Sequence, residues 1–535
     1  MPKKILFIMC DQLRFDYLGC TGHPSIRTPN IDALAKRGVR FDKTYVQSPI
    51  CGPSRMSFYT GRYVRSHGAH WNGFPLRVGE MTLGDHLRPL GVRTVLCGKT
   101  HMVPDTEGMA RLGMDPRSPE GVRSAEGGFE IWDRNDGVTP DGAKKQPTHY
   151  QDHLRSLGYE GENPWHEWAN SGETEAGEIL SGWLLKHAAE PARVAEPESE
   201  TPYTTTRAIE FMEQAKGDSW CLHLSYIKPH WPYIVPAPYH DMYGKDDILP
   251  VSRSDTERVD PHPLMAGYYG HRYSKTFSRD DVREAVIPAY MGLITQIDDQ
   301  IGRLVTYLEE SGQADETLIV FTSDHGDYLG DHWLGEKELF HDQSARIPLI
   351  IMDPSRSADG TRGSICTDLT EAIDLLPTFV DFMGGEVPAH ILEGRSLIPA
   401  VAGTPSPARE VVISEYDYSA RAYLRHLSPD IKSCALTMVY DGRWKMVWVE
   451  GHRPMLFDQQ IDPEEFHDLG GDARYADQIA RLSRHHFDWA RGQHNRVTCS
   501  DAQIDARCYD EAKDGVTLGF WNEDELDAWR RETQG

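Results

Sequence analysis

Side chains that bind cations and anions follow four short apolar runs of this sequence. They are Asp11 after the first run, Lys99 and His101 after the second, His230 after the third, and Asp324 with His325 after the fourth. In an open α/β sheet, ligands bind beyond the carboxyl ends of the strands, so these side chains would converge on one site. Each residue alone is more often a turn, a cap or a structural histidine. Together they suit a divalent cation that holds a small anion among positive side chains.

Cys51 is a candidate nucleophile because of its local sequence. Pro53 fits the first turn of a helix that would run to about Tyr59. Cys51 would then lie at the N-terminus of this helix, where free N–H groups and the helix dipole lower a thiol pKa and attract an oxyanion. These properties favour a nucleophilic cysteine over a core cysteine, and residue type alone goes no further.

The elements that would position these residues are short apolar runs separated by helical patterns. The five clear runs are 5–10, 92–97, 220–226, 318–322 and 347–352. Helical periodicity covers 30–36, 206–215 and 283–310, the last with an apolar stripe from Ile287 to Leu308. This alternation predicts an α/β fold with a parallel sheet between two layers of helices.

Changes in composition along the chain predict its organisation. Residues 1–403 would form the main domain, within which 104–200 lacks apolar runs and would shape a substrate pocket. Short runs after a cluster of breakers at 403–407 predict a small antiparallel α+β subdomain over 404–480. We expect a helical tail over 481–535 whose aromatic residues either dock on another subunit, giving a homo-oligomer (dimer or tetramer), or pack on themselves. Those residues are Trp489, Phe520, Trp521 and Trp529.

The composition excludes several classes of function. The chain has 535 residues, a formal net charge of -26 and no basic block, so nucleic acid would be repelled at long range. The apolar run at 5–10 is far shorter than the roughly 20 residues that span a bilayer, so we expect no membrane partner. The nine cysteines are widely spaced and no secretion signal is evident, so we expect reduced thiols and a cytoplasmic protein.

The segment from Cys51 to Arg55 resembles the sulfatase signature Cys-x-Pro-Ser-Arg, in which the cysteine is oxidised to formylglycine. Further matches are Thr28-Pro29-Asn30-Ile31-Asp32, Gly38-Val39-Arg40-Phe41, Gly98-Lys99-Thr100-His101, Asp324-His325-Gly326, Leu329-Gly330-Asp331-His332 with Lys337, Asp374-Leu375-Leu376-Pro377-Thr378, Glu393-Gly394-Arg395-Ser396-Leu397 and Leu456-Phe457-Asp458 with Asp462-Pro463. They cover about 1–470 in order, apart from the insertion. The resemblance implies an alkaline phosphatase-like fold, in which helices sandwich a mostly parallel sheet and a smaller antiparallel α+β subdomain follows.

The resemblance also implies how the site residues divide the work. Cys51, matured by a formylglycine-generating enzyme, would supply the hydroxyl that attacks sulfur, and Arg55 would hold it. Lys99 and Lys337 would neutralise the sulfate oxygens. Two histidines would move protons: His230 would protonate the leaving alcohol, and His101 would take the proton whose loss releases sulfate.

The metal site implied by the resemblance is Asp11, Asp324, His325 and the modified residue 51. Most sulfatases end the first strand in two aspartates and later carry aspartate with asparagine, whereas this chain has Asp11-Gln12 and Asp324-His325. The same departures occur in choline-sulfatase-like enzymes and phosphonate monoester hydrolases, so the chain resembles that branch. With fewer carboxylates and one imidazole, both Ca²⁺ and Mn²⁺ remain open.

Three functions remain open on the sequence. They are hydrolysis of sulfate esters, hydrolysis of phosphonate monoesters or phosphodiesters with promiscuous sulfatase activity, and inactive binding of sulfated ligands. The third is disfavoured because no residue of the implied site is lost. Lys99 with His101 favours sulfate, since phosphonate monoester hydrolases tend to lack this pair. Asn72 resembles a pocket asparagine of the branch and is otherwise a turn residue; the sequence identifies neither the alcohol nor the metal.

Overall fold

The computed structural model describes residues 3–142, 148–174, 176–492, 496–507 and 511–533. By internal contacts the chain divides into two compact units, one of Met1–Val387 with Leu392–Gln493 and the other of Pro388–Ile391 with His494–Gly535. Within the described ranges, no helix is long and apolar enough to cross a membrane. The eight described cysteines are free thiols, and Cys508 lies outside the described residues.

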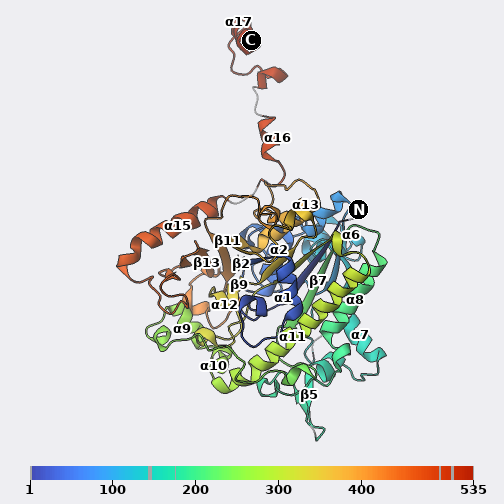
Figure 1. Cartoon of the computed structure of the whole chain (residues 1–535). Helices are drawn as coiled ribbons and strands as arrows, with labels where there is room; N and C mark the ends of the chain where they lie inside the picture. The colour runs from blue at the N-terminus through green and yellow to red at the C-terminus, as the bar shows by residue number, and fades with distance from the viewer. Residues whose placement is uncertain (1–2, 143–147, 175, 493–495, 508–510, 534–535) are drawn as a thin grey trace. The chain divides into compact units, whose positions relative to one another are not determined.

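Nine strands of the described residues form the central sheet of the larger unit (Figure 1). Its order is β11-β2-β10-β8-β1-β7-β3-β4, with β9 paired to β2. The bounds are β1 Lys4–Asp11, β2 Val39–Tyr45, β3 Arg93–Gly98, β4 Glu130–Arg134, β7 Trp220–Pro229, β8 Thr317–Ser323, β9 Arg346–Ile347, β10 Leu349–Met352 and β11 Ile365–Glu371. Strands β8, β1, β7, β3 and β4 are parallel neighbours, which confirms the predicted α/β class with a mostly parallel sheet.

One of the five apolar runs does not join the parallel set. Pro348 divides the run at 347–352 into β9 and β10, and β10 pairs antiparallel with both β2 and β8. Proline has no N–H to give to the strand ladder, so the run is interrupted there. An apolar run indicates that a strand is buried and leaves its direction open.

The helices confirm the periodicity of the sequence. The described α-helices are α1 Pro29–Arg37, α2 Cys51–Thr60, α3 Val64–His67, α4 Leu83–Leu87, α5 Thr106–Leu112, α6 Pro119–Ala125, α7 His149–Ser156, α8 Glu200–Gln214, α9 Pro263–Tyr269, α10 Arg272–Phe277, α11 Asp280–Glu310, α12 Asp342–Ala345, α13 Leu375–Phe382, α14 Ile398–Val401, α15 Ala476–Arg491, α16 Asp501–Asp505 and α17 Glu523–Thr533. The predicted helices correspond to α1, α2, α8 and α11, and only the one at 206–215 extends past its element, by one residue. The apolar stripe of α11, from Ile287 to Leu308, is buried as predicted.

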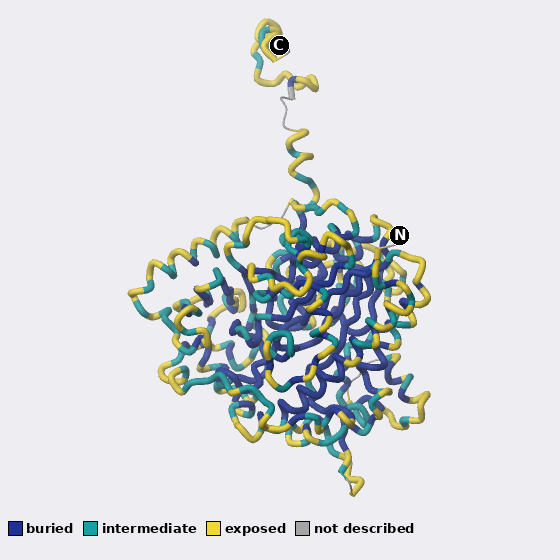
Figure 2. The backbone as a smooth tube through the Cα atoms, viewed as in Figure 1, coloured by how far each residue is buried: buried dark blue, intermediate teal, exposed yellow. Residues whose placement is uncertain are grey.

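Helices cover both faces of the central sheet, which explains why its inner strands are apolar throughout. On one face, α1, α8 and α11 share a buried cluster with Ile8 and Cys10 of β1. On the other face, Phe7 of β1 contacts Phe58 of α2 and Phe379 of α13, with ring centroids 6.1 and 5.3 Å apart. Figure 2, viewed as Figure 1, shows the chain as buried where Figure 1 draws the central strands.

The segment 104–200 contributes more than loops. It holds short helices and a hairpin of β5 Ser171–Glu173 and β6 Ile179–Ser181. It also supplies β4, which extends the central sheet beside β3. The residues of β4 range from exposed to buried and include two acids, so no apolar run revealed this edge strand.

A second, antiparallel sheet follows the central one, as predicted. Its strands are β12 Val412–Asp417, β13 Ala435–Tyr440, β14 Trp444–Val449 and β15 Met455–Asp458. Helix α15 packs on this sheet through Leu482, and its Trp489 lies edge-on to the ring of Tyr63, 5.3 Å between centroids. Trp489 therefore packs within its own chain. The domain limits near 404 and 481, and the docking of the remaining tail aromatics, stay predictions.

Asp298 of α11 ties the first helix to the core. Its carboxylate accepts hydrogen bonds from the backbone N–H groups of Asn30 and Ile31, at 3.1 and 2.7 Å, and from the Asn30 side chain at 2.8 Å. These are N–H groups of the first turn of α1, which have no partner inside the helix. A buried acid thus completes the start of α1.

We expect Asp298→Ala to lower the free energy of unfolding by about 2–3 kcal/mol, because two backbone donors lose a charged acceptor. Glu284→Ala, at an exposed position of the same helix, should change it by no more than about 0.5 kcal/mol. Denaturant unfolding followed by circular dichroism measures both. Equal stability of the two variants would show that Asp298 does not hold α1.

Candidate functional site

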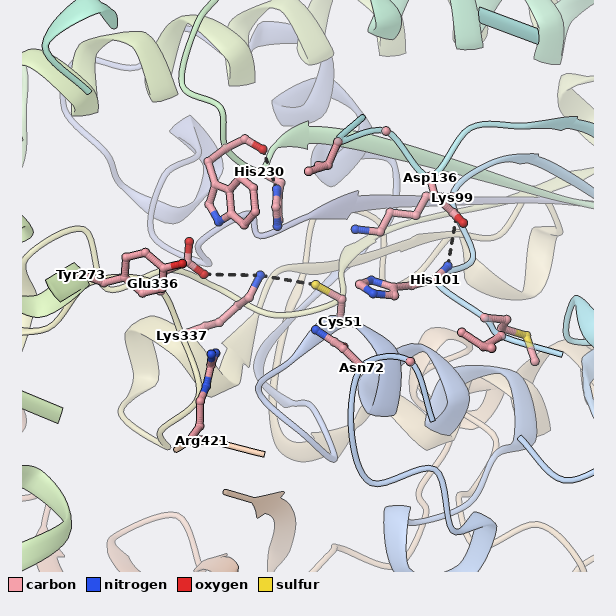
Figure 3. Close-up of a pocket in the computed structure, with 16 residues that line it drawn as sticks. Cys51, Asn72, Lys99, His101, Asp136, His230, Tyr273, Glu336, Lys337 and Arg421 are labelled. Carbon is pink, nitrogen blue, oxygen red and sulfur yellow. Dashed lines mark hydrogen bonds and ion pairs between the residues drawn. The ribbon is translucent and has the colours of Figure 1, made fainter. Parts of the chain in front are cut away.

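The carboxyl ends of four parallel strands bring the predicted residues to one cavity. Asp11 ends β1, Lys99 follows β3, His230 follows β7 and Asp324 follows β8. The cavity has a volume of about 510 Å³, and Figure 3 shows its side chains grouped around Cys51. Its lining includes the predicted Cys51, Asn72, Lys99, His101, His230 and Lys337, and also Asp136, Tyr273, Glu336 and Arg421, which no sequence pattern had indicated.

Four buried side chains below this cavity could hold a metal ion. One ligand atom from each of Asp11, Cys51, Asp324 and His325 lies within 4.8 Å of the others. The Cys51 Sγ lies 3.1 Å from His325 Nε2, and His325 Nδ1 donates to the carbonyl oxygen of Gly326 at 2.9 Å. That bond fixes the ring and leaves Nε2 for the site. Two carboxylates and one imidazole, all out of contact with water, fit one divalent cation.

Arg55 bridges the two carboxylates of this group. Its guanidinium lies 2.8 Å from Asp324 Oδ2 and 3.1 Å from Asp11 Oδ2, and all three side chains are fully buried. A further bond to Ser225 Oγ at 2.8 Å fixes its orientation. Burying two ionised carboxylates without such a cation would cost several kcal/mol of free energy, on the order of the desolvation penalty of each ion. The described hydrogen bonds of Arg55 thus go to the two carboxylates, to Ser225 and to the carbonyl oxygen of Lys99, and its predicted contact with residue 51 stays a prediction.

The charges around Cys51 favour an anion at this position. Burial alone would raise the pKa of the Cys51 thiol, but Lys337, Lys99 and His325 outweigh it and hold this pKa well below the ordinary value. The Lys337 Nζ lies 3.4 Å from the sulfur. The other lysine, Lys99, donates to Asp11 Oδ2 at 2.5 Å.

Gln12 positions Lys337, a role that the sequence did not indicate. The Lys337 Nζ donates to Gln12 Oε1 at 2.8 Å, and Gln12 Nε2 donates to Asp327 Oδ2 at 2.5 Å. The backbone N–H of Gln12 donates to Asp324 Oδ1 at 3.0 Å. Through its side chain Gln12 therefore connects Lys337 to Asp327, and through its backbone it contacts Asp324 of the candidate metal group.

The loop that carries Lys99 and His101 is held by residues of the 104–200 segment. Gly98 has φ +112°, and a Cβ there would lie 2.0 Å from the Ser225 carbonyl oxygen, so only glycine lets β3 approach β7 before Lys99. His101 has φ +57°, and its backbone N–H donates to Asp136 Oδ1 at 3.2 Å. The Asp136 carboxylate also accepts from Arg134 at 2.6 Å. An acid far from any recognised motif thus stabilises a strained histidine.

His230 and Asn72 complete the walls of the cavity. His230 Nδ1 donates to the carbonyl oxygen of Trp231 at 2.7 Å, which leaves Nε2 without this bond. Burial, together with the charge of Lys337, lowers the pKa of His230 to about 4. Asn72 Oδ1 accepts from the backbone N–H of Gly52 at 2.7 Å, where a Cβ would lie 2.8 Å from the same oxygen. Asn72 therefore lies at the start of α2, beside Cys51.

Comparisons with known proteins agree with this geometry. A family model described as Sulfatase matches residues 3–385, and one described as N-sulphoglucosamine sulphohydrolase, C-terminal, matches 330–490. The chain is 33% identical to the multifunctional alkaline phosphatase superfamily protein PehA of Trinickia caryophylli, over 92% of this chain and 96% of that protein. It is 28% identical to a choline-sulfatase of Rhizobium meliloti, over 94% and 88%.

A solved structure gives the same result for the fold. The phosphonate monoester hydrolase SpPMH from Silicibacter pomeroyi superposes with a TM-score of 0.80 and 30% identity, covering 93% of this chain and 97% of that one. The similarity therefore spans both sheets as well as the site.

We expect Asp324→Asn to abolish stoichiometric binding of a divalent ion, because it removes a buried charge and keeps the shape of the side chain. Metal analysis after dialysis measures the ion, and added Mn²⁺ should raise the melting temperature of the unaltered protein but not of the variant. Asp327→Asn is the matched control, since Asp327 is a buried acid three residues further on and outside the metal-binding group. An Asp324→Asn protein that binds the ion with unchanged affinity would show that the site is wrongly placed.

Proposed function

The chain belongs to the sulfatase family, and from this membership we propose that it hydrolyses sulfate esters with a formylglycine made from Cys51 and one divalent cation. The family is one of sulfuric ester hydrolases, and the proposal concerns the substrate and the mechanism. The observation that carries it is the position of Cys51, whose sulfur lies 3.7 Å from Asp11 Oδ1, 3.1 Å from His325 Nε2 and 3.4 Å from Lys337 Nζ. Maturation would require a formylglycine-generating enzyme as a partner.

Asp11, Asp324, His325 and residue 51 would hold the cation, which would supply positive charge to the sulfate oxygens and to the attacking oxygen. Formylglycine at position 51 would supply a hydroxyl nucleophile that an unmodified cysteine lacks. The three oxygen donors, from Asp11, Asp324 and residue 51, and the nitrogen donor of His325 suit both Mn²⁺ and Ca²⁺.

The lysines would bind the anionic part of the substrate. Lys337 is held toward the cavity by Gln12, and Lys99 is held by Asp11, so both ammonium groups are oriented before substrate binds. Burial alone would lower the pKa of Lys99, but Asp11 and Cys51 raise it above its ordinary value, so this lysine stays charged. Fixed charges of this kind stabilise a transition state without reorganisation.

Two histidines would move protons on opposite sides of the sulfur atom of the bound sulfate ester. His230 would hold a proton at Nε2 for the leaving oxygen, since its Nδ1 is committed to Trp231. Its lowered pKa opposes this role in the free protein, and the negative charge of a bound sulfate ester would raise it. His101, held by Asp136, would take the proton from the residue 51 side; its Nδ1 is buried and has no hydrogen-bond partner among the described residues.

A second candidate is hydrolysis of phosphonate monoesters or phosphodiesters. It is favoured by the similarity to SpPMH, which spans almost the whole of both chains. Sulfate and phosphonate esters are tetrahedral oxyanions of similar shape, so one cavity can accept both. The presence of Lys99 and His101 places sulfate esters first in our proposal.

We expect most molecules of the active protein to carry formylglycine at position 51. Mass spectrometry of the peptide that contains this residue detects the change. Cys51→Ser should lower kcat by roughly a thousandfold or more, because the nucleophile cannot be regenerated. A fully active protein with an unmodified thiol would contradict the mechanism.

We expect kcat/KM to be higher for an aryl sulfate than for the phenylphosphonate ester of the same phenol. The leaving group is then identical, so the ratio reports only the transferred group. Initial rates on the metal-loaded protein give this ratio. A higher kcat/KM for the phosphonate would replace the first candidate by the second.

A further inference from the structure

A second and larger cavity adjoins the catalytic one. It has a volume of about 680 Å³ and shares three wall residues with the catalytic cavity, which are Trp231, Tyr273 and Glu336. Figure 3 shows Tyr273 and Glu336 together at one side of the group around Cys51. The two cavities are therefore neighbours that one elongated ligand could occupy.

The walls of this second cavity are mainly aromatic and aliphatic. Trp183 and Leu184 follow the hairpin β5–β6 of the 104–200 segment, and Phe277 ends α10. The rings of Trp183 and Trp231 are 6.0 Å apart between centroids. Leu184 is 53% exposed and adds an accessible aliphatic side chain to these walls.

The aromatic walls of the cavity offer few free polar groups to a sugar, while the charged Lys186 and Arg272 of its lining are exposed. The Tyr233 hydroxyl donates to Asp327 at 2.6 Å, and the Tyr273 hydroxyl accepts from Arg272 at 3.1 Å. Trp231 Nε1 is buried without a hydrogen-bond partner among the described residues. A sugar with several hydroxyl groups would lose most of its hydrogen bonds to water here.

The charges at the cavity disfavour a cationic ligand. Lys186 and Arg272 are exposed and line it, and Glu336 is its single acid among the described lining residues. Burial raises the pKa of Glu336 to about 7, so this carboxyl carries only part of a negative charge near neutral pH. An ammonium group would therefore meet more positive than negative charge.

In the proposed mechanism, the second cavity would lie on the side from which the alcohol departs. The leaving oxygen of an in-line displacement lies opposite the nucleophile at residue 51 and next to the acid, His230. The His230 ring lies 4.3 Å from the ring of Trp231, which is a wall of both cavities. The carbon skeleton attached to the leaving oxygen would thus extend past Trp231 into the second cavity.

We propose that the cavity lined by Trp183, Leu184 and Trp231 binds the leaving alcohol, and that this alcohol is a bulky aromatic or other apolar one rather than a sugar. The inference rests on the proposed sulfate ester hydrolysis and specifies its substrate class. Each additional apolar ring that enters the cavity should strengthen binding of the ester.

The test compares phenyl sulfate with 4-phenylphenyl sulfate, whose phenols have similar acidity, on the matured and metal-loaded protein. We expect kcat/KM to be higher for the biphenyl ester by about tenfold or more. Trp183→Ala should reduce this ratio to below about threefold, mainly through KM of the biphenyl ester. Leu184→Glu places a charge at an exposed position and should do the same without disturbing the fold.

Trp168→Ala is the matched control, since it makes the same substitution in the same segment outside the cavity, and it should keep the full ratio. Equal kcat/KM for both esters in the unaltered protein would overturn the inference. So would a Leu184→Glu variant that keeps the ratio, or faster turnover of glucosamine 6-sulfate than of the biphenyl ester, and both would leave sulfate hydrolysis intact. Failure to hydrolyse any of these esters would instead contradict the proposed function.

Discussion

Two buried carboxylates determine the rest of this site. Asp11 ends β1, Asp324 follows the neighbouring parallel strand β8, and neither carboxylate has contact with water. Charges of the same sign at this distance in a dry interior are unfavourable unless cations neutralise them. Arg55 and Lys99 supply part of that charge, and the remaining donors of the group fit a divalent ion. Cys51 and Arg55 both belong to α2. The helix that brings Arg55 to the two carboxylates therefore also brings residue 51 to the same group.

The sequence could predict this centre because each element that forms it has a strong local signal. The apolar runs that became β1, β3, β7 and β8 are buried on both faces, and the polar residue after each run lies at the edge where ligands bind. The helix beginning at Cys51 was likewise indicated by Pro53 in its first turn. Burial and local chemistry are therefore enough to predict these strands and this helix from the sequence.

The rest depends on contacts between distant segments, which one sequence does not display. Asp136 bonds to the His101 backbone from an edge region with no apolar run, and Gln12 is oriented by Asp327, more than 300 residues away. The antiparallel direction of β10 depends on its neighbours β2 and β8, and its own residues do not encode it. The composition of the 104–200 segment indicated an insertion. It did not indicate the aromatic cavity wall, because that wall forms only where Trp183 packs beside Trp231 of a distant segment. The sequence thus predicts the residues around Cys51, whereas it does not predict the aromatic cavity beside them.

The proposed mechanism requires one cation between the buried carboxylates of Asp11 and Asp324 in the active protein. An anomalous difference map from crystals of catalytically active protein tests this most directly. The account predicts a single strong peak at about 2.0–2.6 Å from oxygens of Asp11 and Asp324, from the His325 nitrogen and from residue 51. A peak held by other residues, or no peak in crystals whose dissolved protein still turns over substrate, would contradict it.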